Sequence, residues 1–406
     1  MDKNKGSFYF VSNTGNDDNS GTSPTLPWKT LEKINQHKFS PGDTIYFERS
    51  GVWRGQLFPQ SGSASGYITY TAYGQGDKPL ILGSVQKNSI DEWKNVGNRL
   101  WYIGPFKRDI GNIIMDDGRV CGVKVWTEID LKHQNNFWFD QKSKILKMYS
   151  LDNPANMYNS IECALREHII DQSNKSYVIY DGLALKYGGA HGIGGNNTSN
   201  IIVRNCEISY IGGGDQFEDD SRVRFGNGVE FWDNAHDCLV EKCKIYEIYD
   251  AALTNQGNSN NNSQVNITYS KNEIWNSEYS FEYWNRPQNS LTKNIVFRGN
   301  ICRDAGRGWG HTQRPDTSGR HLCFFNNTAQ TENFIISENV FDYAENVCIF
   351  IEGNGLNNLV FENNKYIQPK RKVFALWQIN SFLLSDDFDK YKTVTRQDST
   401  STLSFV

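Results

Sequence analysis

Two short segments of this chain each place a glutamate two residues before a tryptophan. They read NGVEFWDN (227–234) and YSFEYWNRP (279–287), and the pairs are Glu230 with Trp232 and Glu282 with Trp284. Two carboxyl groups held roughly 6.5–9.5 Å apart can hydrolyse a glycosidic bond, one protonating the leaving oxygen and the other activating water. A tryptophan ring offers an apolar face for the C–H face of a sugar. The pattern predicts this chemistry, although a glutamate on an exposed strand face can also be only a solvated charge.

The separation of the two glutamates follows from aligning the segments as stacked parallel strands. Three further segments are aligned with the two above, namely HGIGG (191–195), AALTNQGN (251–258) and GWGHTQRP (308–315). An Arg-Pro pair shared by the second glutamate segment and the last of these places Arg286 over Arg314. The residues expected to point inward are Val229, Leu253, Phe281 and Trp309. One outward column then contains Gly194, Glu230, Thr254, Glu282 and Gly310, and the next contains Trp232, Gln256, Trp284 and Thr312. Because neighbouring strands lie about 4.8 Å apart, the two glutamate backbones should be about 9–10 Å apart, with Thr254 and Gln256 beside the substrate.

Further candidates surround this face. Asp250 is a third carboxylate expected to point outward, and His191 is expected to contact the substrate. His311 is a fourth catalytic candidate, although strict alternation turns it inward, where it would be a core or turn histidine. Arg286 and Arg314 could bind a substrate carboxylate through forked donors, or form a salt bridge at the turn, for instance with Asp316. Binding of an acidic sugar would favour a lyase or C5-epimerase that abstracts the proton at C5.

An acidic insert, GGGDQFEDDSRVRFGNG (212–228), lengthens one repeat beside this face. Its weak calcium candidates are Asp215, Asp219 and Asp220. The spacing matches no EF-hand loop, so a solvated loop facing the substrate is the favoured interpretation. We expect no other metal and no other cofactor.

These residues depend on a repeat that sets the fold. Seven segments between Tyr177 and Asn364 begin with a short apolar strand, at steps of 24, 37, 29, 28, 39 and 25 residues, the longest of which is interpreted as two units. A period of about 25 residues with uneven insertions indicates a β-solenoid. One offset after the strand is shared by Cys206, Cys243, Asn272, Asn300, Asn339 and Asn364. Such a column predicts an inward-facing ladder at a turn, rather than a disulfide or metal site.

The remaining segments divide the chain. Residues 1–89 form an N-terminal cap and the first coils, where Thr30 is the expected N-cap of a short helix over 30–38 that covers the open end. Residues 90–165 break the period and are predicted to form a β-hairpin insertion. Residues 166–370 form the coils that carry the groove, and 371–406 a C-terminal cap and tail, all in one continuous solenoid unit.

The opening of the chain resembles that of known proteins. The segments YFVSNTGNDDNSGTSPTLPWKTLEKIN and PGDTIYFERSGVWRGQLF resemble the start of right-handed parallel β-helix proteins of carbohydrate metabolism, with the pectate-lyase-like fold. The resemblance implies an all-β, right-handed parallel β-helix. This fold hosts lyases, hydrolases, epimerases and adhesins alike, so function has to come from the site. The glutamate pair favours a glycoside hydrolase. The alternatives are a polysaccharide lyase or C5-epimerase acting on uronic acids, and a non-catalytic adhesin or tail-spike-like protein that binds polysaccharide.

Composition narrows the partners. The formal net charge is −4 with no basic tract, which disfavours nucleic acid, whereas 11 Trp, 20 Tyr and 23 Phe suit a poly- or oligosaccharide. No apolar run is long enough to span a membrane. The first residues, MDKNKGSFYF, lack the apolar core of a signal peptide. A secreted, periplasmic or cell-surface location after signal removal is favoured, with a cytoplasmic one left open, and a monomer is favoured because no trimerisation stalk is evident.

Overall fold

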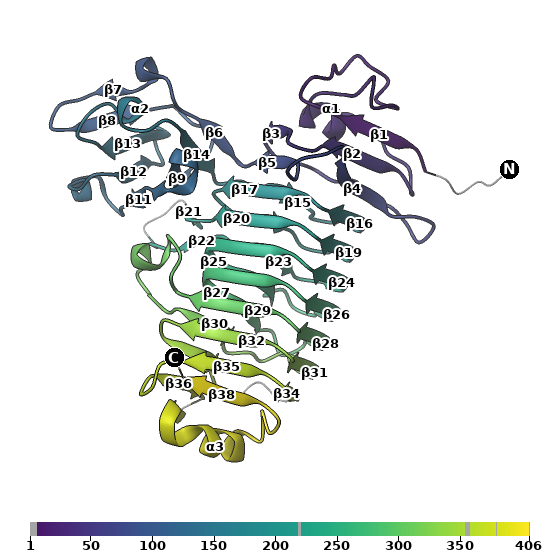
Figure 1. Ribbon diagram of the computed structural model, residues 1–406, viewed down its shortest axis with the longest axis vertical. Helices are drawn as coiled ribbons and strands as arrows, with labels where there is room; N and C mark the ends of the chain where they lie inside the picture. Colours follow the sequence, from purple (N-terminus) through teal and green to yellow (C-terminus); the bar gives the residue numbers. More distant parts are fainter. Residues whose placement is uncertain (1–5, 218–220, 354–357, 379, 406) are drawn as a thin grey trace.

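The chain folds into a parallel β-helix, as the repeat predicts. The structure is a computed structural model, and it describes residues 6–217, 221–353, 358–378 and 380–405. One long parallel sheet runs down the stack of coils (Figure 1). Its strands, in spatial order, are β1 (Phe8–Val11), β2 (Thr44–Glu48), β4 (Ile68–Tyr73), β16 (Ser176–Asp181), β19 (Ser199–Arg204), β24 (Ala235–Glu241), β26 (Ser263–Ser270), β28 (Leu291–Arg298), β31 (Gln330–Ser337) and β34 (Leu359–Glu362).

The predicted repeat segments coincide with the strands from β16 to β34. Within them, buried residues alternate with more exposed ones, as in Val178 and Tyr180 of β16, because every second side chain enters the core. The interpretation of the 39-residue step as two units is wrong. β28 pairs directly with β31, so this step is one coil that carries a long excursion over residues 306–319.

A second, larger sheet forms the opposite wall of the coils. Its strands are β3 (Val52–Arg54), β5 (Leu80–Leu82), β15 (Ile170–Asp171), β17 (Ala184–Gly188), β18 (Ile193–Gly194), β20 (Glu207–Ile211), β23 (Val229–Trp232), β25 (Lys244–Gly257), β27 (Glu273–Asn285), β29 (Ile301–Ala305), β30 (Arg320–Phe324), β32 (Val340–Ala344), β33 (Val347–Ile351), β35 (Lys365–Gln368), β36 (Val373–Trp377), β37 (Asn380–Leu383) and β38 (Thr402–Phe405). Leu185, Val229, Leu253 and Phe281 point from it into the core shared with the first sheet. The long strands β25 and β27 run through two faces of a coil and support the groove described below.

The predicted ladder forms inside one turn of the coils. The backbone N–H of Asn272 donates to Asn300 Oδ1 at 2.9 Å, that of Asn300 to Asn339 Oδ1 at 2.9 Å, and that of Asn339 to Asn364 Oδ1 at 3.0 Å. Cys243 begins the ladder by donating its N–H to Asn272 Oδ1. These buried amides satisfy backbone groups at each bend, and all eight cysteines are free thiols.

The N-terminal helix is present as predicted. α1 spans Leu31–Gln36, and Thr30 caps it by accepting a hydrogen bond from the Lys33 N–H at 3.1 Å. Leu31 and Ile34 are buried against the first coils, so the helix covers the upper end of the core.

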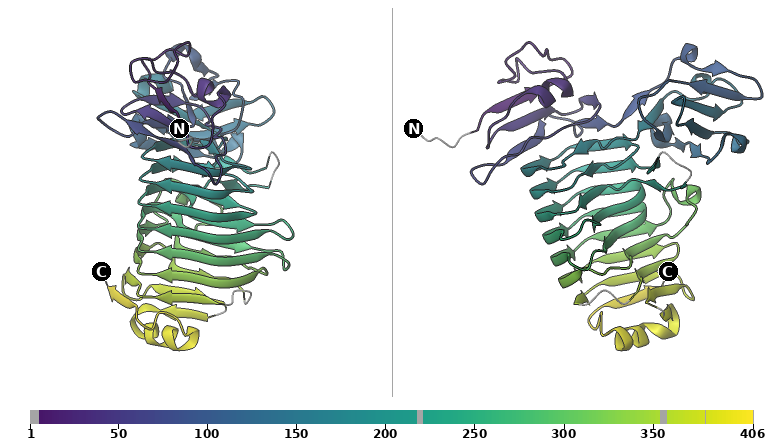
Figure 2. Two further views of the ribbon diagram at one scale, coloured as in Figure 1. Left: turned by 90° about the vertical axis from the view of Figure 1, so that its right-hand side faces the viewer. Right: turned by 180° about the vertical axis from the view of Figure 1, so that it is seen from behind.

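Residues between β6 and β14 fold into two small sheets with a core of their own. One sheet contains β6 (Ser84–Gln86), β9 (Ile110–Met115), β10 (Val120–Cys121) and β14 (Ile161–Leu165); the other contains β7 (Lys94–Asn95), β8 (Leu100–Ile103), β11 (Val123–Lys124), β12 (Asn136–Asp140) and β13 (Ile145–Tyr149). Short helices connect them: η1 (Ile90–Glu92), η2 (Asp116–Gly118), η3 (Glu128–Asp130) and α2 (Pro154–Met157). This insertion and the first coils flank the same end of the stack (Figure 2). At the other end lies α3 (Leu384–Thr395), whose Tyr391 is buried in the main core.

None of the helices in the described part of the chain is long and apolar enough to cross a membrane.

Candidate active site

The predicted register of the glutamate strands is confirmed. Val229 pairs with Leu253 and Leu253 with Phe281, while Glu230 pairs with Thr254 and Thr254 with Glu282. The adjacent column contains Trp232, Gln256 and Trp284. The two glutamates and the three residues of the adjacent column line a groove of about 470 Å³, whereas Thr254 is fully buried and does not. The other residues that line it include His168, His191, Phe225, Asn227, Asp250, Tyr279 and Arg314. A polar groove of this size suits a small number of sugar rings.

The register predicted for residues 308–315 is wrong. The strand that follows β27 in this sheet is β30, which places Leu322 beside Phe281 and Cys323 beside Glu282, instead of Trp309 and Gly310. Residues 306–319 leave the sheet as an excursion that contains η4 (His311–Gln313). The predicted inward position of Trp309 and the column positions of Gly310 and Thr312 are therefore corrected.

His311 ties this excursion to β27 through Glu278. Its Nδ1 lies 2.9 Å from Glu278 Oε2, and Glu278 also accepts hydrogen bonds from the backbone N–H groups of Ser318 and Gly319. The Glu278 hydrogen bond raises the pKa of His311. His311 is not among the residues that line the groove.

Glu230 is held in its ionised form by neighbouring donors. His191 Nε2 lies 3.0 Å from Glu230 Oε1, and Asn227 donates its Nδ2 to Glu230 Oε2 at 2.7 Å. Burial by itself raises the pKa of this carboxyl, but His191, together with His168 and Asn227, outweighs burial and holds the pKa below its ordinary value. Glu230 therefore carries its negative charge at neutral pH.

The tautomer of His191 is fixed by the backbone. The N–H of Asn227 donates to His191 Nδ1 at 2.9 Å, so the proton of the neutral ring resides on Nε2, directed at Glu230. His168 stacks on His191 with ring centroids 4.7 Å apart, and burial lowers the pKa of His168 to about 4. The stacked pair thus places a ring N–H of His191 at Glu230, with His168 packed against the His191 ring.

Glu282 has the opposite environment. Its side chain is buried, and its Oε2 has no hydrogen-bond partner among the described residues. Burial raises its pKa well above the ordinary value, and the like charges of Asp250 and Glu230 raise it further, with Arg314 acting in the other direction. These surroundings favour the protonated form of Glu282.

Asp250 lies beside Glu282, paired with Arg314. Arg314 Nη1 donates to Asp250 Oδ1 at 3.1 Å and to the carbonyl of Tyr249 at 2.9 Å. The guanidinium also lies 3.5 Å from Asp316 Oδ1, the salt bridge expected as the alternative from the sequence. Burial raises the pKa of Asp250, partly offset by Arg314. The charge of Arg314 is thus largely neutralised within the protein.

The remaining predicted contact residues lie along the same face. The rings of Trp232 and Trp284 meet edge to face with centroids 5.2 Å apart, and the exposed Arg286 stacks on Trp284 at 4.7 Å. Gln256 lines the groove between the tryptophans. Thr254 lies between the two glutamates, and its buried hydroxyl has no hydrogen-bond partner in the described structure.

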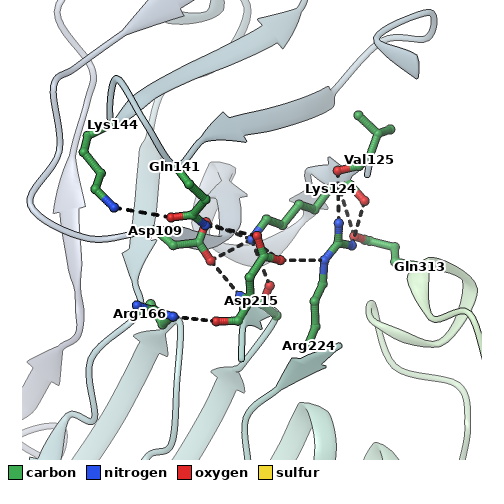
Figure 3. Close-up of polar contacts among 10 residues, drawn as sticks. Asp109, Lys124, Val125, Gln141, Lys144, Arg166, Asp215, Arg224 and Gln313 are labelled. Carbon is green, nitrogen blue, oxygen red and sulfur yellow. Dashed lines mark hydrogen bonds and ion pairs between the residues drawn. The ribbon is translucent and has the colours of Figure 1, made fainter. Parts of the chain in front are cut away.

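The carboxylate of the calcium candidate Asp215 is paired with the positively charged side chains of Lys124 and Arg224. Its carboxylate lies 3.1 Å from Lys124 Nζ and 3.2 Å from Arg224 Nε, and it accepts a hydrogen bond from Gln141 (Figure 3). A calcium ion would have to displace these partners. Asp219 and Asp220 lie outside the described residues. Among the described residues, no group of three acidic, histidine or cysteine side chains could hold a metal ion.

Several groove residues were missed from the sequence, namely His168, Phe225, Asn227, Tyr279 and Phe325. A signal existed for His168, since aligning HII (168–170) with HGI (191–193) places one histidine over the other, and Ile170 does pair with Ile193. Asn227 has no comparable signal, because its role depends on hydrogen bonds to three different strands and loops.

Comparison with known proteins supports the fold. No protein-family model matches this chain. Over 106 residues it is 37% identical to a lacto-N-biosidase of Bifidobacterium longum subsp. longum, a match that covers 23% of this chain and only 6% of that protein. Among solved structures, it is similar to XylC in complex with xylose (TM-score 0.53, 12% identity, 93% of this chain and 73% of that one). It is also similar to pectate lyase Pel9A (TM-score 0.53, 11% identity, 99% and 77%). The similarity to these structures confirms the pectate-lyase-like parallel β-helix.

Proposed function

We propose that this protein is a carbohydrate-active enzyme, a glycoside hydrolase that cleaves a poly- or oligosaccharide with Glu282 as acid and Glu230 as base. One observation carries the proposal: of two carboxyl groups in one outward column, Glu230 is hydrogen-bonded to His191 and Asn227, whereas Glu282 is buried with an unpartnered oxygen beside Asp250. These surroundings displace the two pKa values in opposite directions. Opposed displacement in neighbouring carboxyls is the arrangement that acid–base hydrolysis requires. The resemblance of one segment to a lacto-N-biosidase, a glycoside-cleaving protein by its name, supports the same class.

The expected reaction uses both groups once per turnover. Glu282 gives its proton to the glycosidic oxygen as the bond between that oxygen and the anomeric carbon breaks. Glu230 takes a proton from a water molecule whose oxygen forms the new bond to the anomeric carbon. The two strands are separated by one strand between them, so the two backbones lie about 9–10 Å apart and the carboxyl groups face the same groove. Trp232 and Trp284 would hold the sugar rings.

The lyase alternative has weaker support in this groove. Neutralising a uronate requires an available cation, whereas Arg314 is already paired with Asp250 and Asp316. Arg286 is exposed and stacked on Trp284, so it is the better candidate for contacting an acidic sugar.

The test is a panel of polysaccharides and aryl glycosides, followed by reducing ends and by the ultraviolet absorbance of unsaturated uronates. Reducing ends without absorbance support hydrolysis; absorbance would instead support elimination, and neither signal would favour the adhesin. Glu230→Gln and Glu282→Gln should each lower kcat by about 10²–10⁴-fold. Glu273→Gln, on the exposed part of the same strand β27, is the matched control and should retain activity.

The leaving group separates the two roles. The dinitrophenolate released from a dinitrophenyl glycoside leaves without being protonated. This substrate should therefore restore most turnover to Glu282→Gln and none to Glu230→Gln. Equal recovery in both variants would refute the assignment.

We also propose that the protein acts outside the cytoplasm, since polysaccharides do not cross membranes; cell fractionation tests this.

A further inference from the structure

A second cavity, of about 880 Å³, lies next to the groove. Its insertion side includes Trp126, Trp138, Asp140 and Gln141, and its coil side includes Asp215 and Val223. Val223 also lines the groove, together with its neighbour Arg224. The two hollows therefore share a wall, the hairpin of β21 (Gly214–Asp215) and β22 (Arg224–Phe225).

This wall is fixed by a buried set of ion pairs (Figure 3). Lys124 Nζ of the insertion contacts Asp109 Oδ2 at 2.8 Å and Asp215 Oδ1 at 3.1 Å, and the side chains of Lys124 and Asp109 are almost fully buried. Gln313 of the excursion accepts a hydrogen bond from the Lys124 N–H at 2.9 Å. A buried, fully paired network of this kind holds its members in one arrangement. The insertion is thus positioned rigidly against the groove.

The same network prepares an aromatic platform. Arg224 donates to the backbone carbonyls of Lys124 and Val125, and its guanidinium lies 3.6 Å from the centre of the Trp126 ring. One face of Trp126 is thereby held, and the partly exposed side chain lines the cavity. Trp138 is partly exposed in the same cavity, with Lys147 Nζ 5.7 Å from its ring centre. Tryptophans whose orientation is fixed in advance lose little entropy when a ligand stacks on them.

We propose that this cavity is an additional carbohydrate-binding subsite, in which Trp126 and Trp138 bind sugar residues that extend from the groove. The proposal rests on the proposed function for the identity of the ligand. Val223 lines both hollows, so a sugar chain that crosses the rim at this residue could occupy both. The rim carries acidic and basic side chains, Asp140 and Lys142 among them, which suits hydroxyl groups rather than one sign of charge. The insertion therefore makes the enzyme selective for longer substrates.

The test measures binding without turnover. In native gels that contain polygalacturonate, arabinoxylan or galactomannan, a protein that binds the polymer migrates more slowly. All binding variants are made in the double variant Glu230→Gln/Glu282→Gln, called the parent, so that the polymer is not cleaved. Trp126→Ala and Trp138→Ala in this parent should each weaken the retardation constant for the same polymer by about three- to tenfold. Phe58→Ala removes an exposed aromatic ring outside both cavities and is the control, expected to leave retardation unchanged. Thermal unfolding verifies that each variant is folded.

In otherwise wild-type protein, Trp126→Ala should also lower the ratio of kcat/KM for polymer to that for an aryl glycoside. Unchanged retardation in both tryptophan variants would overturn the subsite, and so would a parent that none of the three polymers retards. Retardation that depends on Trp126 in a protein without hydrolytic activity would instead refute the hydrolase and leave the subsite standing.

Discussion

Replacing His191 by phenylalanine removes the donor that keeps Glu230 ionised while preserving a ring of similar shape. The His191 Nε2 to Glu230 Oε1 distance is 3.0 Å, and both side chains are less than a tenth exposed. A hydrogen bond to a charged group contributes about 1.5–3 kcal/mol, and one pKa unit corresponds to about 1.4 kcal/mol. His191→Phe should therefore raise the pKa of Glu230 by about one to two units. The acidic limb of kcat/KM against pH should move upward by the same amount.

The assay is a pH profile of kcat/KM on an aryl glycoside. The alkaline limb reports Glu282 and should stay in place, and His236→Phe, a change at an exposed histidine outside the groove, should alter neither limb. Because folding lowers the pKa of Glu230, its ionisation stabilises the fold above the ordinary carboxyl range, and this contribution is lost as pH falls through the folded pKa. The stability difference between variant and wild type should therefore shrink on acidification. An acidic limb that is unmoved or shifts downward would refute the role of His191.

Three further changes test neighbouring parts of the structure. Asp250→Asn removes a like charge beside Glu282, so the alkaline limb of the pH profile should fall by about one unit; an upward shift would contradict this. Lys124→Met leaves Asp109 buried without its cation and should lower the free energy of unfolding in urea by about 3–5 kcal/mol. Asn300→Ala breaks the turn ladder and should cost about 2–3 kcal/mol in the same assay, and a cost below 1 kcal/mol would show that the ladder is not stabilising.

The coils could be predicted because their determinants repeat along the chain. Alternation in segments such as Tyr177–Asp181 identifies the inward residues, and a one-residue slip would turn all of them outward. The Val229, Leu253 and Phe281 register was predictable for the same reason, and it brought Glu230 and Glu282 into one column.

The alignment failed where a short similarity was not a repeat. Arg286-Pro287 and Arg314-Pro315 have the same two residues, yet only the first pair ends a strand of the coil sheet. Glycines allow the second segment to leave the sheet: Gly306 has φ of 84°, and a Cβ on Gly310 would lie 2.7 Å from the Tyr249 ring. A glycine-rich segment carries little inward–outward pattern, so alternation could not reveal the mistake.

The partners of the insertion could not be predicted either. Lys124 and Asp215 are 91 positions apart, and neither lies in a repeat that would relate them. Their contact depends on how a separately folded unit packs on the coils, which the sequence pattern does not encode.

The roles of the two glutamates follow from the same distinction. By column position Glu230 and Glu282 are equivalent, and the sequence gives no reason to assign acid to one and base to the other. Their difference comes from residues outside the column: His191 and Asn227 donate to Glu230, whereas Asp250 presents a like charge to Glu282. Exchanging the roles would require Glu230 to be protonated against its donors and Glu282 to be ionised while buried beside two carboxylates. Both steps oppose the local electrostatics, and for this reason we propose protonation from the Glu282 side of the groove and water activation from the Glu230 side.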